Sequence, residues 1–320
     1  MVRKKLTKSF LQFVLALIGI FCLGAFPYLF FDLEMREKIY KIQVLLDSGK
    51  LRNTLFLYQS ITFNVQDYFH SIKLTIHEFI HYSEMTYIDI RNSERPLFPF
   101  FNELYVNSLK YLSLSILVSF VSSIIFTYSI MLLPVKIKKR IKMCFFILES
   151  LPDLFVILSL QSLVIWMYKK TGILLFQTVS TFGDEAFMIP LLVLSFLPTV
   201  YMTRYLLLSF EDEYESLYVE LARGKGLTKL ELLVKHIFRN AFASFIFHFK
   251  TIFWFTISNL LMIEIILNIN GFFRFIYVNS ARNPELLTLC MLFMFVPFFL
   301  IMTLLESMVG RISLKGVDES

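Results

Sequence analysis

The sequence is poor in the residues that mark several common protein classes. Of its 320 residues only 3 are cysteine, 10 are glycine, 9 are proline and 2 are tryptophan, and 18% are charged. The cysteines Cys22, Cys144 and Cys290 lie in apolar stretches without metal-ligand spacing, which excludes a disulfide framework. Globular chains are about 45–50% apolar and about a quarter charged, whereas this chain is 57% hydrophobic. These scarcities exclude a collagen, a disordered chain and an ordinary soluble protein.

What the sequence does contain is long apolar runs. A helix needs about 20 apolar residues to cross a hydrocarbon core about 30 Å thick. Six stretches meet this requirement: 9–31, 107–133, 143–168, 187–209, 243–267 and 285–309. The first follows a basic N-terminus, but it is too long for a signal peptide and no small-residue cleavage site follows it. The sequence therefore predicts an all-α polytopic membrane protein with six transmembrane helices, the first of them uncleaved.

The distribution of lysine and arginine predicts the orientation of these spans. With the N-terminus inside, the inner segments 3–8, 136–142, 223–239 and 311–315 carry 16 basic residues, and the short outer loops carry four, Lys169, Lys170, Arg274 and Arg282. Basic residues favour the cytoplasmic side in short loops. Both termini are therefore expected in the cytoplasm, and the net charge of +6 is explained without a nucleic-acid partner.

The spans divide the chain into four parts. Residues 1–31 form the first transmembrane helix, and 32–106 form an extracytoplasmic segment that is expected to be mostly helical, for example from Gln66 to Tyr87. Residues 107–310 form the main membrane domain, which contains a cytoplasmic loop at 210–242. Residues 311–320 form a cytoplasmic tail.

The loop at 210–242 has the pattern of two helices joined by a glycine turn. The first apolar face is predicted by helical spacing and consists of Phe210, Tyr214, Leu217, Tyr218, Leu221 and Ala222. Gly224 and Gly226 end this helix, and Thr228 with Glu231 forms a capping box that begins the second. The second apolar face consists of Leu230, Leu233, Ile237 and Ala241. Such a unit offers one face to a cytoplasmic partner; the alternative is a solvated amphipathic connector.

Residues Glu220 to Gly226 in this loop resemble the EAA loop of ABC importer permeases. The longer run Tyr218–Thr228, continued at His236–Ala241, is similar to the dipeptide/oligopeptide permease family. Four further elements of the same family are matched: Pro190–Pro198 with Arg204–Tyr205, Ser150–Phe155, Glu264 with Gly271, and Asn283–Pro284. The resemblance covers about 107–310. Departures from the family pattern are Leu221, Ser244, Asn270 and Phe273, and the outer segment lacks the Gly-Asp-Leu-Gly type of motif.

This resemblance implies a transport subunit that is not an enzyme and has no cofactor. Its loop would couple to ATPases through Glu220, Ala222, Arg223, Gly224 and Gly226. It implies as partners a second homologous permease, two cytoplasmic ATP-binding subunits, an extracytoplasmic solute-binding protein and the lipid bilayer. It implies the inner (cytoplasmic) membrane of a bacterium as the location, and di- or oligopeptides as the solute, with nickel and other solutes left open. The run from Gly224 to Thr228 fails the spacing of a phosphate-binding loop, so the ATP must be bound by another chain.

Polar residues inside the spans are candidates for the substrate pathway. Intramembrane ionisable groups are costly and tend to face a cavity or a partner. Asp153 and Asn259 are expected to line the pathway, and Glu264, near the outer end, is expected at a gate or docking contact. The alternative for each is helix–helix packing through hydrogen bonds.

A second functional hypothesis rests on the outer segment. His77-Glu78-Phe-Ile-His81 matches the H-E-x-x-H pattern of zinc metallopeptidases, in which two imidazoles share one helix face and the glutamate is a general base. His70 lies on the same face, and Glu103 could supply a third ligand. The alternative is the polar face of an outer helix, with no metal.

Overall fold

The computed structural model describes residues 2–30, 42, 45–46, 49–50, 63–89, 93–172, 177, 180, 186–280, 283 and 285–318. Much of the predicted outer segment between 31 and 62, together with Arg282 and Pro284, lies outside the described residues. The chain forms two compact units. One comprises Met1–Glu103 with Phe275–Thr303, and the other comprises Leu104–Arg274 with Leu304–Ser320.

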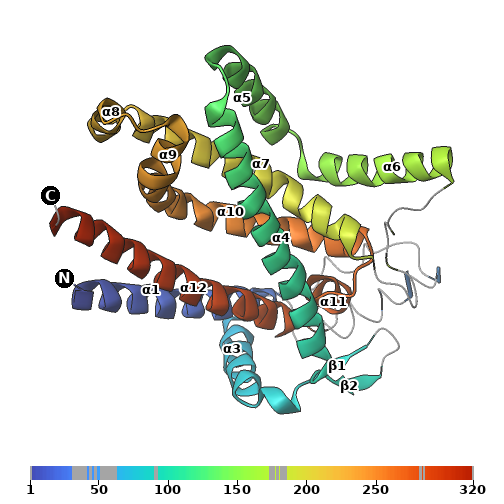
Figure 1. The fold of residues 1–320 in the computed structure, drawn as a ribbon. Helices are drawn as coiled ribbons and strands as arrows, with labels where there is room; N and C mark the ends of the chain where they lie inside the picture. Colours follow the sequence, from blue (N-terminus) through green and yellow to red (C-terminus); the bar gives the residue numbers. More distant parts are fainter. Residues whose placement is uncertain are drawn as a thin grey trace. The chain divides into compact units, whose positions relative to one another are not determined.

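Helices dominate the described chain (Figure 1), as expected from the sequence. The elements before residue 100 are α1 (Val2–Gly24), the 3-10 turn η1 (Phe26–Leu29), α3 (Val65–Ile80), η3 (Tyr82–Glu84), β1 (Thr86–Ile88) and β2 (Glu94–Pro96). The elements after it are α4 (Phe100–Leu132), α5 (Val135–Glu149), α6 (Asp153–Thr171), α7 (Met188–Tyr214), α8 (Leu217–Gly224), α9 (Lys229–Leu232), the π turn η4 (Leu233–Ile237), α10 (Phe238–Ile266), α11 (Phe272–Asn279) and α12 (Glu285–Asp318).

Four described helices are long and apolar enough to cross a membrane. They are Phe100–Leu132, Met188–Tyr214, His248–Ile266 and Glu285–Leu304, and each overlaps a predicted span. The bent pair of α5 and α6 would make a fifth span. The first predicted span contains only a shorter apolar helix, Ser9–Gly24, which is about 24 Å long at about 1.5 Å per residue. The number of six spans therefore remains a prediction, as does the orientation.

The span predicted at 143–168 is not one helix. Helix α5 ends at Glu149 and α6 begins at Asp153, and the two axes differ by 101°. Pro152 is the residue that precedes α6, with φ −62° and ψ 138°. Proline has no amide hydrogen to donate and disfavours the helical conformation of the residue before it, so it starts a helix well and continues one badly. The apolar run alone did not reveal this corner.

In the unit that contains the N-terminus, α1 packs against α12 through aromatic rings and is joined to α3 by a hydrogen bond. Phe13 stacks on Phe295 of α12 with 5.9 Å between ring centroids, and the Tyr68 hydroxyl of α3 donates to the Cys22 carbonyl at 3.2 Å. A Cβ at Gly24 would lie 1.8 Å from the Thr288 hydroxyl oxygen, so this glycine permits the close approach of α1 and α12.

The predicted helix from Gln66 to Tyr87 is too long. Asn64 caps the N-terminus of α3 by accepting from the Gln66 amide at 3.1 Å, as expected of an N-cap residue, but the helix ends at Ile80. The chain then forms the antiparallel pair of β1 and β2, in which Tyr87 lies opposite Arg95. The described residues are thus all-α except for this short hairpin, which the prediction missed. Its strand β1 contains Thr86, Tyr87 and Ile88, whose side chains favour extended backbone.

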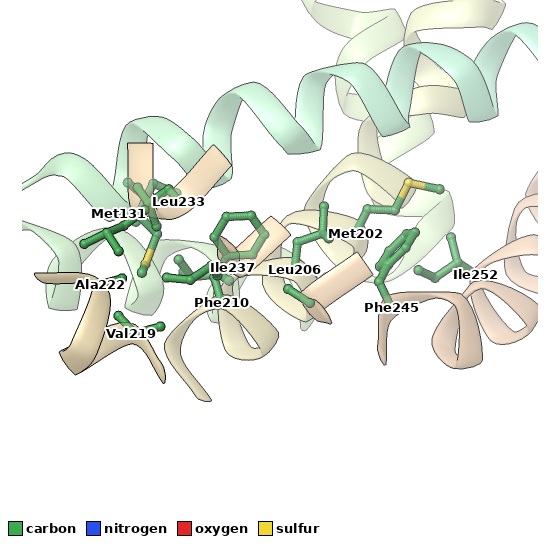
Figure 2. Close-up of a cluster of buried hydrophobic side chains, with 14 residues drawn as sticks. Met131, Met202, Leu206, Phe210, Val219, Ala222, Leu233, Ile237, Phe245 and Ile252 are labelled. Carbon is green, nitrogen blue, oxygen red and sulfur yellow. The ribbon is translucent and has the colours of Figure 1, made fainter. Parts of the chain in front are cut away.

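In the other unit, α7 and α10 pack along each other and carry many of the buried apolar side chains. Met202, Leu206 and Phe210 of α7 belong to one buried cluster with Ile237 of η4 and Phe245 of α10 (Figure 2). Leu206 and Ile237 are fully buried at 0% exposure.

Helix α4 contributes a buried face of hydroxyl side chains to the same unit. These residues follow helical spacing and are Ser108, Ser115, Ser119, Ser123 and Thr127. The Ser119 hydroxyl donates to the Ser195 carbonyl of α7 at 2.9 Å. Small hydroxyl residues let helix backbones approach closely and supply interhelical hydrogen bonds in membranes.

Candidate functional site

The cytoplasmic loop predicted at 210–242 begins with a break that the sequence pattern concealed. The predicted single helix over 210–222 is wrong, because α7 ends at Tyr214 and α8 begins at Leu217. The Ser216 hydroxyl donates to the Glu213 carbonyl at 2.6 Å and the Tyr218 hydroxyl donates to the Glu213 carboxylate at 2.5 Å. Burial, followed by this contact with Glu213, raises the pKa of Tyr218, so the tyrosine remains a neutral donor. These bonds hold the corner between α7 and α8.

The break rotates the apolar residues of α8 into two groups. Val219 and Ala222 are buried at 0% and 7% exposure and belong to the core around Phe210 (Figure 2). Leu217 and Leu221 are instead 79% and 70% exposed. The residue spacing predicted all of them except Val219 on one face, and the start of a new helix at Leu217 explains the difference.

The residues expected to couple to an ATPase lie on α8 and the turn after it. Ala222 packs inside its own chain, whereas Glu220, Arg223, Gly224 and Gly226 are exposed. The Arg223 guanidinium lies 4.1 Å from the centroid of the Tyr214 ring. Gly226 has φ +83°, a left-handed conformation that residues with a Cβ rarely adopt. The structure thus brings these five residues into one short helix and its glycine turn.

The second half of the loop begins as predicted. Thr228 accepts from the Glu231 amide, and the Glu231 carboxylate accepts from the Thr228 amide at 3.0 Å, which completes the capping box. Hydrogen bonds from the backbone and hydroxyl of Thr228 lower the pKa of Glu231. Helix α9 then continues through the π turn η4 into α10 without a loop. This π turn explains why Leu230, predicted on the buried face, is 54% exposed while Leu233 and Ile237 are fully buried.

The three residues expected to line a substrate pathway do not form one site. Asp153 is the first residue of α6, at the corner with α5, where its carboxylate suits a helix N-terminus. Asn259 and Glu264 lie five residues apart on α10, which places them about 140° apart around the helix. Asn259 is 4% exposed and its Oδ1 atom has no hydrogen-bond partner among the described residues.

The buried carboxylate of Glu264 binds the loop that follows α10. Glu264 accepts from the Ser108 hydroxyl at 2.5 Å and from the Arg274 amide at 3.0 Å. The Ser108 hydroxyl in turn accepts from the Phe272 amide at 2.8 Å. A Cβ at Gly271 would lie 2.1 Å from the Glu264 carboxyl carbon, so glycine is required there. The Glu264 side chain therefore caps the N-terminus of α11, because it accepts a hydrogen bond from an amide of the first turn.

Three ion pairs join α5 to α7. Glu211 pairs with Lys138 at 2.6 Å and with Lys142 at 2.5 Å. Arg204 pairs with Glu149 and lies 5.6 Å from the Phe146 ring centroid. The four-residue spacing of Lys138 and Lys142 could have indicated one helix face directed at a carboxylate, but it could not identify the partner.

The H-E-x-x-H residues do not share one helix. Helix α3 ends at Ile80, and His81 follows it with φ −102° and ψ 38°. The His81 Nδ1 atom lies 3.1 Å from the His77 carbonyl, and the two rings stack with 4.5 Å between centroids. In the part of the chain that the structure describes, no three His, Cys, Asp or Glu side chains are grouped to hold a metal ion.

Comparison with known proteins gives two similarities. Among solved structures, one described as an amino acid ABC transporter with histidines aligns with a TM-score of 0.48 and 13% identity, over 68% of this chain and 94% of that chain. No curated protein is significantly similar in sequence. The family model described as "Binding-protein-dependent transport system inner membrane component" matches residues 116–315, which include α7 to α10 and the whole cytoplasmic loop. This chain therefore belongs to the family of binding-protein-dependent transport system inner membrane components.

Proposed function

We propose that this chain forms half of the membrane channel of an ATP-driven importer and receives force from ATP-binding subunits through residues 210–242. Membership of the family makes it a transport subunit, not an enzyme, and one component of an ABC importer. The metallopeptidase alternative is therefore wrong.

The observation that carries the coupling role is the exposed edge of α8. Leu217 and Leu221 are 79% and 70% exposed although Val219 and Ala222 of the same helix are buried. Glu220, Arg223 and Lys225 surround these leucines with charge. A small apolar centre with a polar rim is the usual anatomy of a protein interface. The edge is therefore suited to a groove on an ATP-binding subunit.

The continuity of the loop with the membrane helices provides a path for movement. Helix α9 passes through η4 into α10 with no intervening coil, and α10 packs against α7 through Phe245 and Met202. Displacement of α8 and α9 would therefore move α10 and α7 as packed bodies, which is a form of rigid-body switching. Glu220, Ala222, Arg223, Gly224 and Gly226 keep distinct parts in this proposal. Ala222 anchors α8, Gly226 makes the turn, and the other three face outward.

The complete importer in this proposal has four further components. They are a second homologous permease, two cytoplasmic ATP-binding subunits and an extracytoplasmic solute-binding protein. Exposed apolar side chains on α6 support contact with the second permease or with lipid, among them Leu158, Leu163 and Trp166. The complex would lie in the inner membrane of a bacterium. The motif run from Tyr218 to Ala241 supports a di- or oligopeptide as the solute, and Asp153, Asn259 and Glu264 remain proposed pathway residues.

The coupling role is tested by truncating the exposed edge. The double variant Leu217→Ala, Leu221→Ala should fold normally, because both side chains are exposed, but should reduce copurification of the coexpressed ATP-binding subunits by about tenfold or more. The control Ile80→Ala removes an apolar side chain that is 68% exposed on α3, in the predicted outer segment. Equal copurification of both variants would refute the proposal.

The solute is tested separately with the assembled importer in proteoliposomes. Uptake of a labelled tripeptide is measured in competition with unlabelled dipeptides, longer peptides, single amino acids and a nickel chelate. Inhibition by short peptides alone supports the peptide proposal. Inhibition by the nickel chelate alone would refute the peptide proposal and indicate a nickel complex as the solute, while leaving the proposed coupling role unchanged.

A further inference from the structure

Helix α5 is too short to cross a membrane, and its basic residues are concentrated in its first half. Its 15 residues extend about 22 Å, compared with a hydrocarbon core of about 30 Å. Five of them are basic: Lys136, Lys138, Lys139, Arg140 and Lys142. A 101° corner then leads to α6 (Figure 1). A helix of this length and charge suits the boundary of a membrane, because charged side chains are costly inside the hydrocarbon core.

Among the residues that the structure describes, two of these five cations pair with a carboxylate. Lys138 and Lys142 lie four residues apart and both pair with Glu211. Glu149, on the same helix face, pairs with Arg204. These pairs direct one face of α5 toward α7. Lys136, Lys139 and Arg140 are exposed, and the ion pairs of the described residues include none of them.

The three remaining cations cluster on a different side of α5 from the two paired lysines. At about 100° per residue, Lys136, Lys139 and Arg140 fall within about 100° of one another, and their mean direction lies about 130° from that of Lys138 and Lys142. Residues three and four apart on a helix have Cβ atoms about 5–6 Å apart, so the three charges form one patch. No acidic residue shares α5 before Glu149. The patch is therefore complementary to a dense negative charge.

The same outer face becomes apolar along the helix. After Arg140 it presents Met143 and Ile147, which are 65% and 52% exposed, with Phe146 beside them at 58%. A face that is cationic for two turns and apolar for the next two matches the change from lipid headgroups to acyl chains. Lysine and arginine extend their charges toward headgroups at such positions.

We propose that Lys136, Lys139 and Arg140 form a binding site for the phosphate of an anionic phospholipid, with the acyl chains lying along Met143, Phe146 and Ile147. The apolar continuation favours a lipid over free phosphate, which would use only the cationic end. The pairing of Lys138 and Lys142 with Glu211 holds the patch outward and separate from α7. The site belongs to this chain alone and does not depend on the ATP-binding subunits.

The test uses the full chain, purified in detergent and depleted of lipid. The protein is titrated with phosphatidylglycerol or with phosphatidylcholine. The number of bound lipid molecules is measured by native mass spectrometry. Wild-type protein should bind phosphatidylglycerol about tenfold or more tightly than phosphatidylcholine. The variant Lys136→Gln, Lys139→Gln, Arg140→Gln should lose this preference. The control Lys169→Gln, Lys170→Gln, Lys225→Gln removes the same charge elsewhere and should retain it.

Two further arms distinguish the source of the phosphate and the role of the apolar residues. Inorganic phosphate at millimolar concentration should not displace phosphatidylglycerol, whereas Ile147→Asn should weaken phosphatidylglycerol binding severalfold. The proposal is overturned if the triple variant keeps the preference, if the control loses it equally, or if inorganic phosphate displaces the lipid completely.

Discussion

At the scale of single residues, the contact between Gly271 and Glu264 shows how the chain keeps a carboxylate inside a membrane domain. Glu264 is 0% exposed and accepts from the Ser108 hydroxyl and the Arg274 amide, and Gly271 leaves room for its carboxyl group. A buried polar group that loses its hydrogen bonds costs about 1–3 kcal/mol. Glu264 is therefore held in place by its hydrogen bonds to Ser108 and to the start of α11.

This contact leads to a prediction for Gly271→Ala. The new Cβ would lie within 2.4 Å of three atoms of the Glu264 carboxyl group, so the carboxylate must move away from Ser108 and the Arg274 amide. The Tm in detergent should fall by about 5–10 °C. The matched control is Gly19→Ala, because a Cβ at Gly19 meets nothing within 4 Å. Equal Tm values for the two variants would show that the clash is relieved without cost.

The side-chain amide of Asn283 makes the two backbone hydrogen bonds with β1 that a neighbouring strand would otherwise make. Its Oδ1 accepts from the Ile88 amide at 2.9 Å and its Nδ2 donates to the Ile88 carbonyl at 3.0 Å. Both backbone groups of Ile88 that face away from β2 are thus satisfied. The sequence marked Asn283 only as part of a family-like Asn-Pro element, because side-chain pairing across 195 residues leaves no local pattern.

At the scale of elements, the capping box of α9 has a defined pH dependence. Hydrogen bonds from Thr228 lower the pKa of Glu231 in the folded chain. A carboxyl group with a lowered folded pKa contributes stability above its unfolded pKa and loses it as the pH falls through the folded value. The start of α9 should therefore be fully capped at neutral pH and weaken only in acid.

This dependence is measured by NMR titration of a labelled Glu231 carboxyl carbon in the full chain. The midpoint should lie below the ordinary value of 4.5 for glutamate, and Thr228→Ala should raise it toward that value because the hydroxyl bond is removed. Identical midpoints in wild type and Thr228→Ala would contradict the assigned cause.

The elements also show which parts of the fold a sequence can predict. The capping box, the turn at Gly226 and the helices of four spans follow from local patterns and are confirmed. The corner at Pro152 and the break before Leu217 were missed, because both lie within continuous helical or apolar patterns. Each depends on backbone geometry and on bonds such as that from Tyr218 to Glu213, which hydrophobic spacing does not report.

At the scale of the whole molecule, the topology depends on α1. Four helices and one bent pair give up to five spans, and five spans would put the termini on opposite sides. The 16 basic residues of the predicted inner segments, compared with four in the short outer loops, favour six spans with both termini inside. The short apolar helix Ser9–Gly24 would then have to cross the membrane.

Cysteine labelling tests this topology in whole cells. A single cysteine placed at Thr7 or at Ser320, in a background without the native cysteines, should be protected from an impermeant maleimide until the cells are opened. A cysteine at Glu94 of β2 is the control and should react at once. Labelling of only one terminus in intact cells would establish an odd number of spans.

The π turn η4 sets the rotational relation between the coupling loop and the membrane helices. Its five residues, Leu233–Ile237, accommodate one residue more than the α-helical hydrogen-bonding pattern would. Removing one residue there would restore a regular helix and leave α10 in register with α7, while turning α9 by about 100° about its axis. The π turn therefore determines which face of α9 lies in line with a given face of α10. Torque applied to α9 would be transmitted along one continuous helix, so the loop can twist the spans as well as push them.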